Sequence, residues 1–336
     1  MRHGGLQGSD SVSTHHPLKP LPDPIHLKIE FPANNRALFI LPLIVAFTLM
    51  ALSPPVRAQL YVTNYNNDTI GKYNATTGAL INASFITGLS KPVGIVVSGN
   101  DLFVANATTE TISRYNATTG ALINASFITG LSQPFGLEIS GTSLFVVNRS
   151  GGTIGQYNSS TGAAINASFV TGLLNPYSVL VSGSDLFVGN TGNSTVGKYN
   201  ATTGAAISAS LLSAGAPIGL EVSGTTLFVG HQGNGTIGTY NAITGAAINA
   251  SFITGISYPN DIALSGSDLF VVRNTGSIGR YDATSGALLD DSFITGLSQP
   301  QFIAFATAIP EPSTYAMLAG LGALGLALLR RKRRAA

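Results

Sequence analysis

The sequence predicts an all-β fold, a six-bladed β-propeller over residues 59–306, and two observations carry that prediction: a repeat of nearly constant length and a one-strand offset between its ends. A Leu followed by Tyr or Phe begins at Leu60 and recurs at intervals of 42, 42, 42, 41 and 42 residues. A period in this range is typical of repeat proteins, whose units bury their apolar faces against neighbouring units.

Each repeat contains four short β-rich segments, for which residues 93–130 serve as the example. The segments cover residues 93–98, 101–106, 111–116 and 121–128, and turns bearing Gly or Asn separate them. Alternating polar and apolar residues over such short runs indicate strands rather than helices. We therefore expect one four-stranded antiparallel sheet per repeat.

The offset between the two ends favours a closed ring. The repeats begin with the Leu-aromatic strand at Leu60 but end with the strand that follows the Pro position, residues 301–305. In a propeller the last strand completes the first sheet and removes free edges, whereas a stacked β-solenoid has to cap both ends. The repeat also resembles NHL-type and related six-bladed propeller repeats, with Pro92-x-Gly94 opening the innermost strand and an apolar LFV second strand.

Residues 1–58 are interpreted as a secretory signal peptide with an over-extended start. An uncharged apolar run, residues 37–52, follows Arg36, and small residues precede a cleavage site after Ala58. This order of a positive flank, an apolar core and small residues is that of a signal peptide. The alternative is an uncleaved membrane anchor.

Residues 307–336 combine three features: the triplet Pro310-Glu311-Pro312, an apolar run at 315–329 and a basic end at 330–334. The ordered set resembles the PEP-CTERM sorting signal. That resemblance implies an exosortase-type sorting enzyme as partner, export to the envelope, outer surface or matrix of a Gram-negative bacterium, and transient anchoring in the inner membrane. A helix of 15 residues spans only about 22 Å of a bilayer core of about 30 Å, which favours a transient stop.

Charge and cysteine content exclude two classes of function. Residues 59–312 hold seven Lys and Arg against twelve Asp and Glu, a net charge near −5, although the whole chain is +2. A basic surface for nucleic acid is therefore absent from this part, and no nucleic-acid partner is expected. The sequence contains no cysteine, so disulfides and thiol chemistry are excluded.

The candidate ligand-binding residues follow the second strand of each repeat, where the loops of a propeller meet at the channel mouth. Many related repeats have Asp at this position. Here it is occupied by Asn64, Asn106, Asn148, Asn190, His231 and Arg273. Asp261, at the entrance of an innermost strand, joins this set. The alternative for the Asn residues is structural, because Asn tolerates left-handed turn geometry and bonds its own backbone.

Glu138 and Glu221 occupy one equivalent position inside their innermost strands, where the other repeats have Val, Leu or Ala. With Asp261 they could supply oxygen ligands to a hard cation, and calcium is the possible metal; otherwise no cofactor is expected. The alternative is that these acids line the channel and are solvated by water.

Thirteen Asn-x-Ser/Thr triplets occur between Asn67 and Asn249. Most arise from repetition of the YNATTG and NASF segments, where Asn and Thr suit turn and strand, and glycosylation is the other interpretation.

Two hypotheses for function remain. Residues 73–90 and 115–132 are identical, and such sameness disfavours the asymmetric arrangement that most active sites need. We therefore expect a non-catalytic surface or matrix propeller that binds exopolysaccharide or another envelope component, such as a surface protein. The alternative is a propeller lyase or hydrolase that uses His231, Arg273 and the inner acids at the channel mouth.

Overall fold

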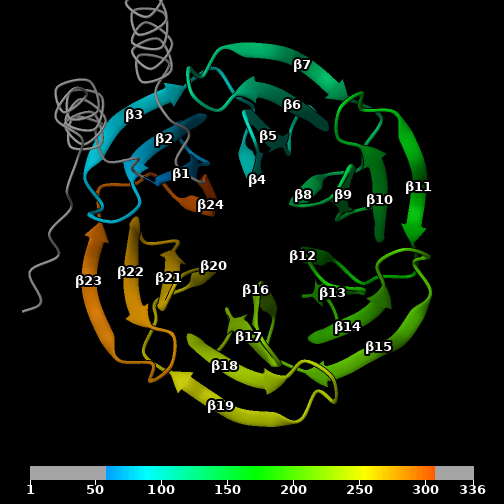
Figure 1. Cartoon of the computed structure of the whole chain (residues 1–336), viewed down its shortest axis with the longest axis vertical. Coiled ribbons are helices and arrows are strands. Elements are labelled where there is room, and N and C mark those ends of the chain that lie inside the picture. The colour runs from blue at the N-terminus through cyan, green and yellow to red at the C-terminus, as the bar shows by residue number, and fades with distance from the viewer. Residues whose placement is uncertain (1–57, 307–336) are drawn as a thin grey trace, which may run out of the picture. The chain divides into compact units, whose positions relative to one another are not determined.

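The computed structural model describes residues 58–306, which form six four-stranded antiparallel sheets around a central axis (Figure 1). The predicted six-bladed β-propeller is confirmed, and no helix occurs within these residues. The predicted signal peptide, the triplet Pro310-Glu311-Pro312 and the segments 315–329 and 330–334 lie outside the described residues, apart from Ala58.

The six blades are numbered along the chain, and each is given from the axis outward. Blade 1 consists of β24 (Pro300–Ala306), β1 (Gln59–Asn64), β2 (Thr69–Asn74) and β3 (Leu80–Ile86). Blade 2 consists of β4 (Pro92–Ser98), β5 (Asp101–Asn106), β6 (Thr111–Asn116) and β7 (Leu122–Ile128). Blade 3 consists of β8 (Pro134–Ser140), β9 (Ser143–Asn148), β10 (Thr153–Asn158) and β11 (Ala164–Val170). Blade 4 consists of β12 (Pro176–Ser182), β13 (Asp185–Asn190), β14 (Thr195–Asn200) and β15 (Ala206–Ser213). Blade 5 consists of β16 (Pro217–Ser223), β17 (Thr226–His231), β18 (Thr236–Asn241) and β19 (Ala247–Ile253). Blade 6 consists of β20 (Pro259–Ser265), β21 (Asp268–Arg273), β22 (Ser277–Asp282) and β23 (Leu288–Ile294).

Ring closure occurs in blade 1, as the offset predicts. The last strand, β24, pairs antiparallel with β1, so that Leu60 lies opposite Phe305 and Gln59 opposite Ala306. The two ends of the repeat region thus share one sheet, and its innermost strand comes from the opposite end of the sequence to the other three.

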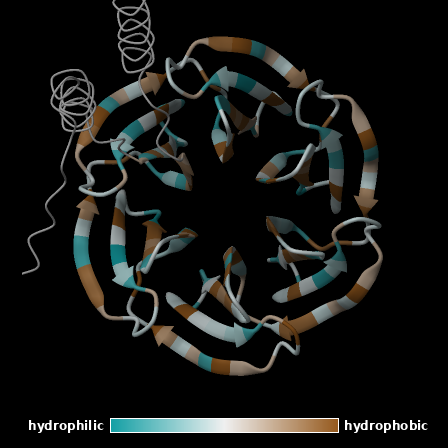
Figure 2. Cartoon of the chain, in the orientation of Figure 1, coloured by the Kyte–Doolittle hydropathy of each residue, from teal (hydrophilic) through white to brown (hydrophobic). Residues whose placement is uncertain are grey.

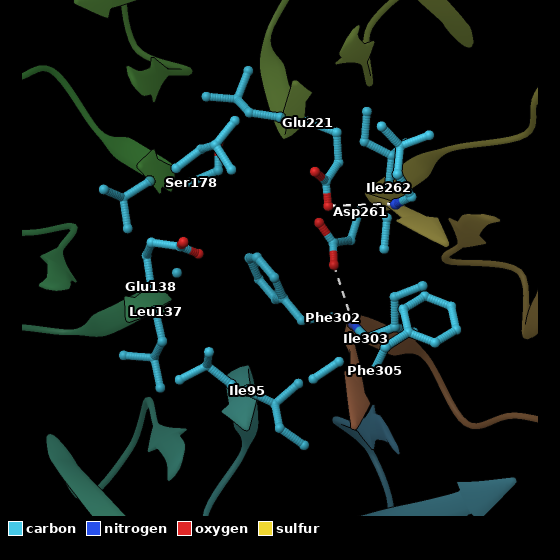
Figure 3. A pocket seen from close by; sticks show the side chains of 18 of the residues that line it. Ile95, Leu137, Glu138, Ser178, Glu221, Asp261, Ile262, Phe302, Ile303 and Phe305 are labelled. Carbon is cyan, nitrogen blue, oxygen red and sulfur yellow. Dashed lines mark hydrogen bonds between the residues drawn. The ribbon is translucent and has the colours of Figure 1, made fainter. Parts of the chain in front are cut away.

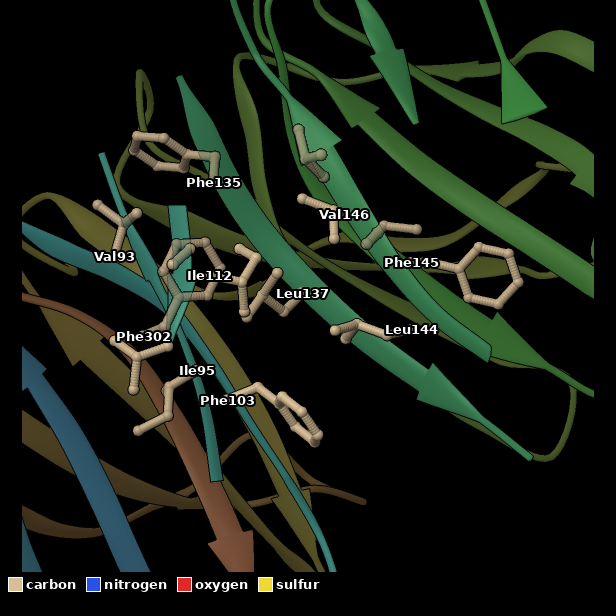
Figure 4. Close-up of a cluster of buried hydrophobic side chains, with 14 of the residues drawn as sticks. Val93, Ile95, Phe103, Ile112, Phe135, Leu137, Leu144, Phe145, Val146 and Phe302 are labelled. Atoms are coloured by element: carbon tan, nitrogen blue, oxygen red, sulfur yellow. The ribbon is translucent and has the colours of Figure 1, made fainter. Parts of the chain in front are cut away.

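The core lies between neighbouring blades. In blade 2 the second-strand residues Leu102, Phe103 and Val104 are at most 1% exposed. Figure 4 shows Phe103 beside Leu137 and Leu144 of blade 3. A sheet that is apolar on both faces cannot be stable alone, so the blades stabilise one another by burying this area, at roughly 25 cal/mol per Å².

The Pro-x-Gly motif sets the distance between innermost strands. A Cβ on Gly94 would collide with the backbone carbonyl oxygen of Phe135 in blade 3. A Cβ on Gly219 would lie 2.5 Å from the backbone nitrogen of Ile262. Close backbone approach to the next blade therefore favours glycine at Gly94 and Gly219. Blades 4, 6 and 1 have Ser178, Asp261 and Phe302 at the equivalent position.

The outermost strands leave apolar side chains on the rim of the ring. Leu80, Leu122, Ile165, Ile207 and Ile248 are each at least 54% exposed. Figure 2 shows apolar residues alternating with polar ones along these strands. The rim is thus a ring of free sheet edges with exposed aliphatic side chains.

Candidate ligand-binding sites

The central channel contains a cavity of about 240 Å³, which the innermost strands line (Figure 3). The equivalent position that holds Glu138 and Glu221 faces this cavity in all six blades. Its other occupants are Val96, Leu180, Ala263 and Ala304.

Each of the three channel acids accepts a hydrogen bond from the backbone of the next blade. The Glu221 carboxylate accepts from Leu264 N–H at 3.4 Å, and Asp261 accepts from Ile303 N–H at 3.1 Å. Glu138 accepts in the same way from the backbone of Val181. Each carboxylate therefore accepts a hydrogen bond from an N–H group on the channel-facing edge of a strand. Without it, that N–H group would lack a partner in the sheet.

The channel environment raises the pKa of all three acids. Burial raises the pKa of Glu138 to about 8, and the nearby negative charge of Glu221 adds to this shift. Burial also raises the pKa of Glu221 to about 7 and raises that of Asp261 well above its ordinary value. No Lys, Arg or His is among the residues that line the cavity.

The three acids do not form a compact ligand set. Figure 3 shows Glu221 and Asp261 close together, with Glu138 on the opposite wall. Within residues 58–306, no three His, Cys, Asp or Glu side chains are grouped so that they could hold a metal ion. Calcium binding stays a prediction, and the arrangement offers it at most the Glu221–Asp261 pair.

The Asn position lies inside the blades rather than on the channel. Asn64, Asn106, Asn148 and Asn190 are at most 6% exposed, and none of the four lines the channel cavity. Three of the Asn side chains hold the loop that leads to an innermost strand. They accept hydrogen bonds from the backbone N–H groups of Ser298, Ser90 and Ser132 at 3.2, 3.2 and 3.3 Å.

These four Asn residues do not adopt the left-handed backbone geometry that the structural alternative considered. Positive φ angles occur instead later in the same turns, at Asp68, Glu110 and Ser194, and at the residue before each Pro of the innermost strands. The residues before Pro are Lys91, Gln133, Asn175, Ala216, Tyr258 and Gln299, with φ between 46° and 54°. Asn64, Asn106 and Asn148 thus follow the second strand directly and hold the neighbouring loop before Pro through their side chains.

His231 and Arg273 also contact their own blades. His231 Nε2 lies 3.2 Å from the hydroxyl of Tyr240, and burial lowers the pKa of this imidazole. Arg273 donates to the Tyr281 hydroxyl at 2.6 Å and forms an ion pair with Asp291 at 2.5 Å. Neither residue lines the cavity that contains Glu138, Glu221 and Asp261, so the structure separates the two parts of the predicted catalytic set.

An aromatic cluster crosses the channel, and sequence analysis missed it. The ring of Phe302 stacks on Tyr177 at 5.5 Å between centroids and meets Phe135 edge-on at 6.0 Å. The Arg149 guanidinium lies over Phe135 and Tyr177, 5.0 and 5.7 Å from the ring centroids. Phe135 and Tyr177 occupy the same strand position in two consecutive repeats. An aromatic residue at this position in both repeats is the signal from which the cluster could have been predicted.

Ligand-sized hollows occur between blades on the outer side of the ring. One of about 500 Å³ lies between blades 1 and 2, and an equivalent one of about 470 Å³ lies between blades 5 and 6. The first is lined by Phe85, Tyr115 and hydroxyl residues, among them Thr87, Thr109 and Ser126. In the second, Arg273 and Asp291 replace Asn106 and Ala125. A third hollow, of about 520 Å³, also lies at the boundary of blades 5 and 6.

Comparison with known proteins identifies the C-terminal segment. Residues 308–334 match the family model described as the PEP-CTERM protein-sorting motif. The chain carries a PEP-CTERM sorting motif. This motif indicates an exported protein that an exosortase-type enzyme processes and whose C-terminus is transiently anchored in the membrane. Within residues 58–306, no helix is long and apolar enough to cross a membrane.

The propeller that precedes the PEP-CTERM motif has structural relatives but no match among curated proteins. A chain in the crystal structure of a nidogen/laminin complex aligns over 75% of this chain and 99% of its own length, with 15% identity and a TM-score of 0.66. The computationally designed Ika8 protein aligns over 72% and 73%, with 18% identity and a TM-score of 0.46. At such identity the nidogen/laminin likeness shows the fold alone; it agrees with the NHL-like repeat read from the sequence.

Proposed function

We propose that the protein is a non-catalytic propeller of the cell surface or extracellular matrix of a Gram-negative bacterium, and that it binds exopolysaccharide in the hollows between its blades. The observation that carries this proposal is the pair of equivalent hollows, each near 500 Å³, at two blade boundaries. Ligand sites in proteins are concave, typically about 300–1,000 Å³, and combine apolar or aromatic walls with a few polar groups.

The chemistry of the hollow between blades 1 and 2 suits a neutral sugar chain. Phe85, Leu122 and Tyr115 supply apolar surface, while Thr87, Ser126 and neighbouring hydroxyl groups can donate and accept hydrogen bonds. No charged residue lines this hollow. A polymer of repeating units can contact both equivalent hollows of one ring, which raises its overall affinity without strong single sites.

The separation of the ionisable groups supports a non-catalytic role. Hydrolase- or lyase-type chemistry needs an acid, a base and a charge-stabilising group within reach of one substrate. His231 and Arg273 bond Tyr side chains of their own blades, whereas Glu138, Glu221 and Asp261 face the channel cavity.

Retention of the full chain on immobilised exopolysaccharides tests the proposal. Thr87→Arg places a long charged side chain in the hollow between blades 1 and 2 and is expected to weaken retention. Thr142→Arg, at the equivalent exposed turn of blade 3, whose residues line none of the three hollows, is the matched control. Failure of the wild-type chain to bind any polysaccharide, or equal retention of the two variants, would contradict the proposal.

A further inference from the structure

The outermost strand of every blade is a free sheet edge. In all six sheets this strand pairs on one side only. An edge with unpaired N–H and C=O groups can add a strand from another chain, and proteins that remain monomeric protect their edges. The six edges of this ring are not protected equally.

Five edges carry the same side-chain cap. Asn82 Oδ1 accepts a hydrogen bond from the backbone N–H of Ser84 at 3.0 Å, where the register between β2 and β3 shifts. The equivalent bonds, 2.9–3.1 Å long, join Asn124 to Ser126, Asn166 to Ser168, Asn249 to Ser251 and Asp290 to Ser292. An N–H group bound by its own strand is not available to an incoming strand. The repeated NAS triplets are therefore edge caps in the fold.

Blade 4 lacks this cap. Its outermost strand, β15, has Ser208 where the other blades have Asn or Asp, and within the described residues no side chain caps Ser210 N–H. β15 is also the longest outer strand, with eight residues against seven in each of the others. Leu211 replaces the Phe that packs on the second strand in the other five blades.

We propose that β15 pairs antiparallel with β15 of a second copy of this chain, forming a dimer with two-fold symmetry. β15 and the residues beside it, 199–215, contain no charged residue. Self-pairing therefore brings no like charges together. In β23, by contrast, self-pairing would bring together strands that each carry Asp290 and Asp291. Because only one edge per ring is uncapped, the contact uses the same surface on both partners and closes at two copies.

Cross-linking locates the contact, and the absence of native cysteine gives a clean background. Ala209 is exposed near the middle of β15, and Ala250 occupies the equivalent exposed position in the capped strand β19. Under mild oxidation of the full chain in detergent, Ala209→Cys is expected to form a disulfide-linked dimer and Ala250→Cys is not. Equal cross-linking of the two variants, or none in either, overturns the proposal.

Exchanging the caps tests the cause. Ser208→Asn supplies the missing cap and is expected to weaken dimerisation about tenfold or more, because each dimer must displace two added hydrogen bonds. Asn124→Ser removes a cap in blade 2 and is expected to produce assemblies larger than a dimer. Ser208→Ala, which supplies no cap, should dimerise as the wild type does. Light scattering over a concentration series measures the oligomeric state of the wild type and of the three variants. A wild-type chain that stays monomeric, or a Ser208→Asn variant that dimerises as strongly as the wild type, overturns the proposal.

Discussion

Thr63 and Phe302 hydrogen-bond to each other in both directions across 239 residues of sequence. The Thr63 hydroxyl accepts from the backbone N–H of Phe302 at 2.9 Å and donates to its carbonyl oxygen at 3.2 Å. The bonds lie where the β1–β24 register is irregular, so a side chain replaces the missing backbone pairing. The corresponding residues of the other blades are Ala105, Val147, Gly189, Gly230 and Val272, so this clasp belongs to blade 1.

Thr63→Val should weaken ring closure. The substitution keeps the shape of the buried side chain but leaves the N–H and C=O of Phe302 without these partners, at a cost of about 1–3 kcal/mol. Urea denaturation of the full chain measures the loss. Thr225→Val, at an exposed turn, is the control and should change the free energy of unfolding by less than about 0.5 kcal/mol. Equal stability of the two variants would show that the clasp contributes nothing.

Gly94→Ala should destabilise the ring far more than Gly233→Ala. A methyl group at Gly94 meets the Phe135 carbonyl, whereas one at Gly233 meets no atom within 4 Å. Relieving the first contact requires two blades to move apart, and overpacking of this kind costs about 1–3 kcal/mol or more. Thermal unfolding of both variants checks this, and similar melting temperatures would contradict the packing described for the innermost strands.

Protonation of Glu138 predicts how stability depends on pH. Its pKa is raised to about 8 in the folded chain and is about 4.3 when unfolded, so the folded state binds more protons between these values. The stabilisation of the folded state by protonated Glu138 is fully present below pH ~4.3 and is lost as pH rises through ~8.

Glu138→Gln should therefore unfold at higher urea than the wild type at pH 9, and the difference should shrink toward pH 5. The amide oxygen can still accept the hydrogen bond from Val181. Chemical denaturation at several pH values provides the test. A constant difference across this range would mean that the carboxyl titrates normally.

Arg273 and Asp291 should behave as a coupled pair. The Arg273 side chain is only 11% exposed, so Asp291→Ala leaves a poorly solvated charge with one fewer partner and should cost about 1–3 kcal/mol. The double variant Arg273→Asn/Asp291→Ala recreates the Asn106 and Ala125 pair of blade 2 and should be more stable than the single Asp291→Ala variant. A double-mutant cycle on unfolding free energies measures the coupling, and strict additivity would refute it.

Sequence predicted the fold closely because the decisive signals are local and repeated. Alternating polar and apolar residues predict each strand, and the glycines predict the turns between them. The innermost strand of blade 2 begins at Pro92, one residue before the expected Val93. Closure followed from counting strand types, which needs no knowledge of side-chain packing.

The site could be predicted only in part, because the repeat gives the strand and the position along it but not whether a side chain at a strand end turns toward the channel or into the blade. Glu138 and Glu221 lie on innermost strands and therefore reach the channel. Asn106 lies on a second strand, where its side chain bonds Ser90 N–H and the Ser113 hydroxyl inside the blade. The Phe302 contact with Tyr177 joins blades 1 and 4. The position of Phe302 is Gly in three other blades, so no periodic pattern predicts this contact.

Closure by β24 also orders events in time. The innermost strand of blade 1 ends at Ala306, and the PEP-CTERM motif begins at residue 308. An exported chain that emerges from its N-terminus can build blades 2 to 6 in sequence, but blade 1 waits for nearly the last residues to arrive. Completion of the ring and exposure of the motif to the sorting enzyme therefore depend on the export of adjacent residues, because only residue 307 separates β24 from the motif.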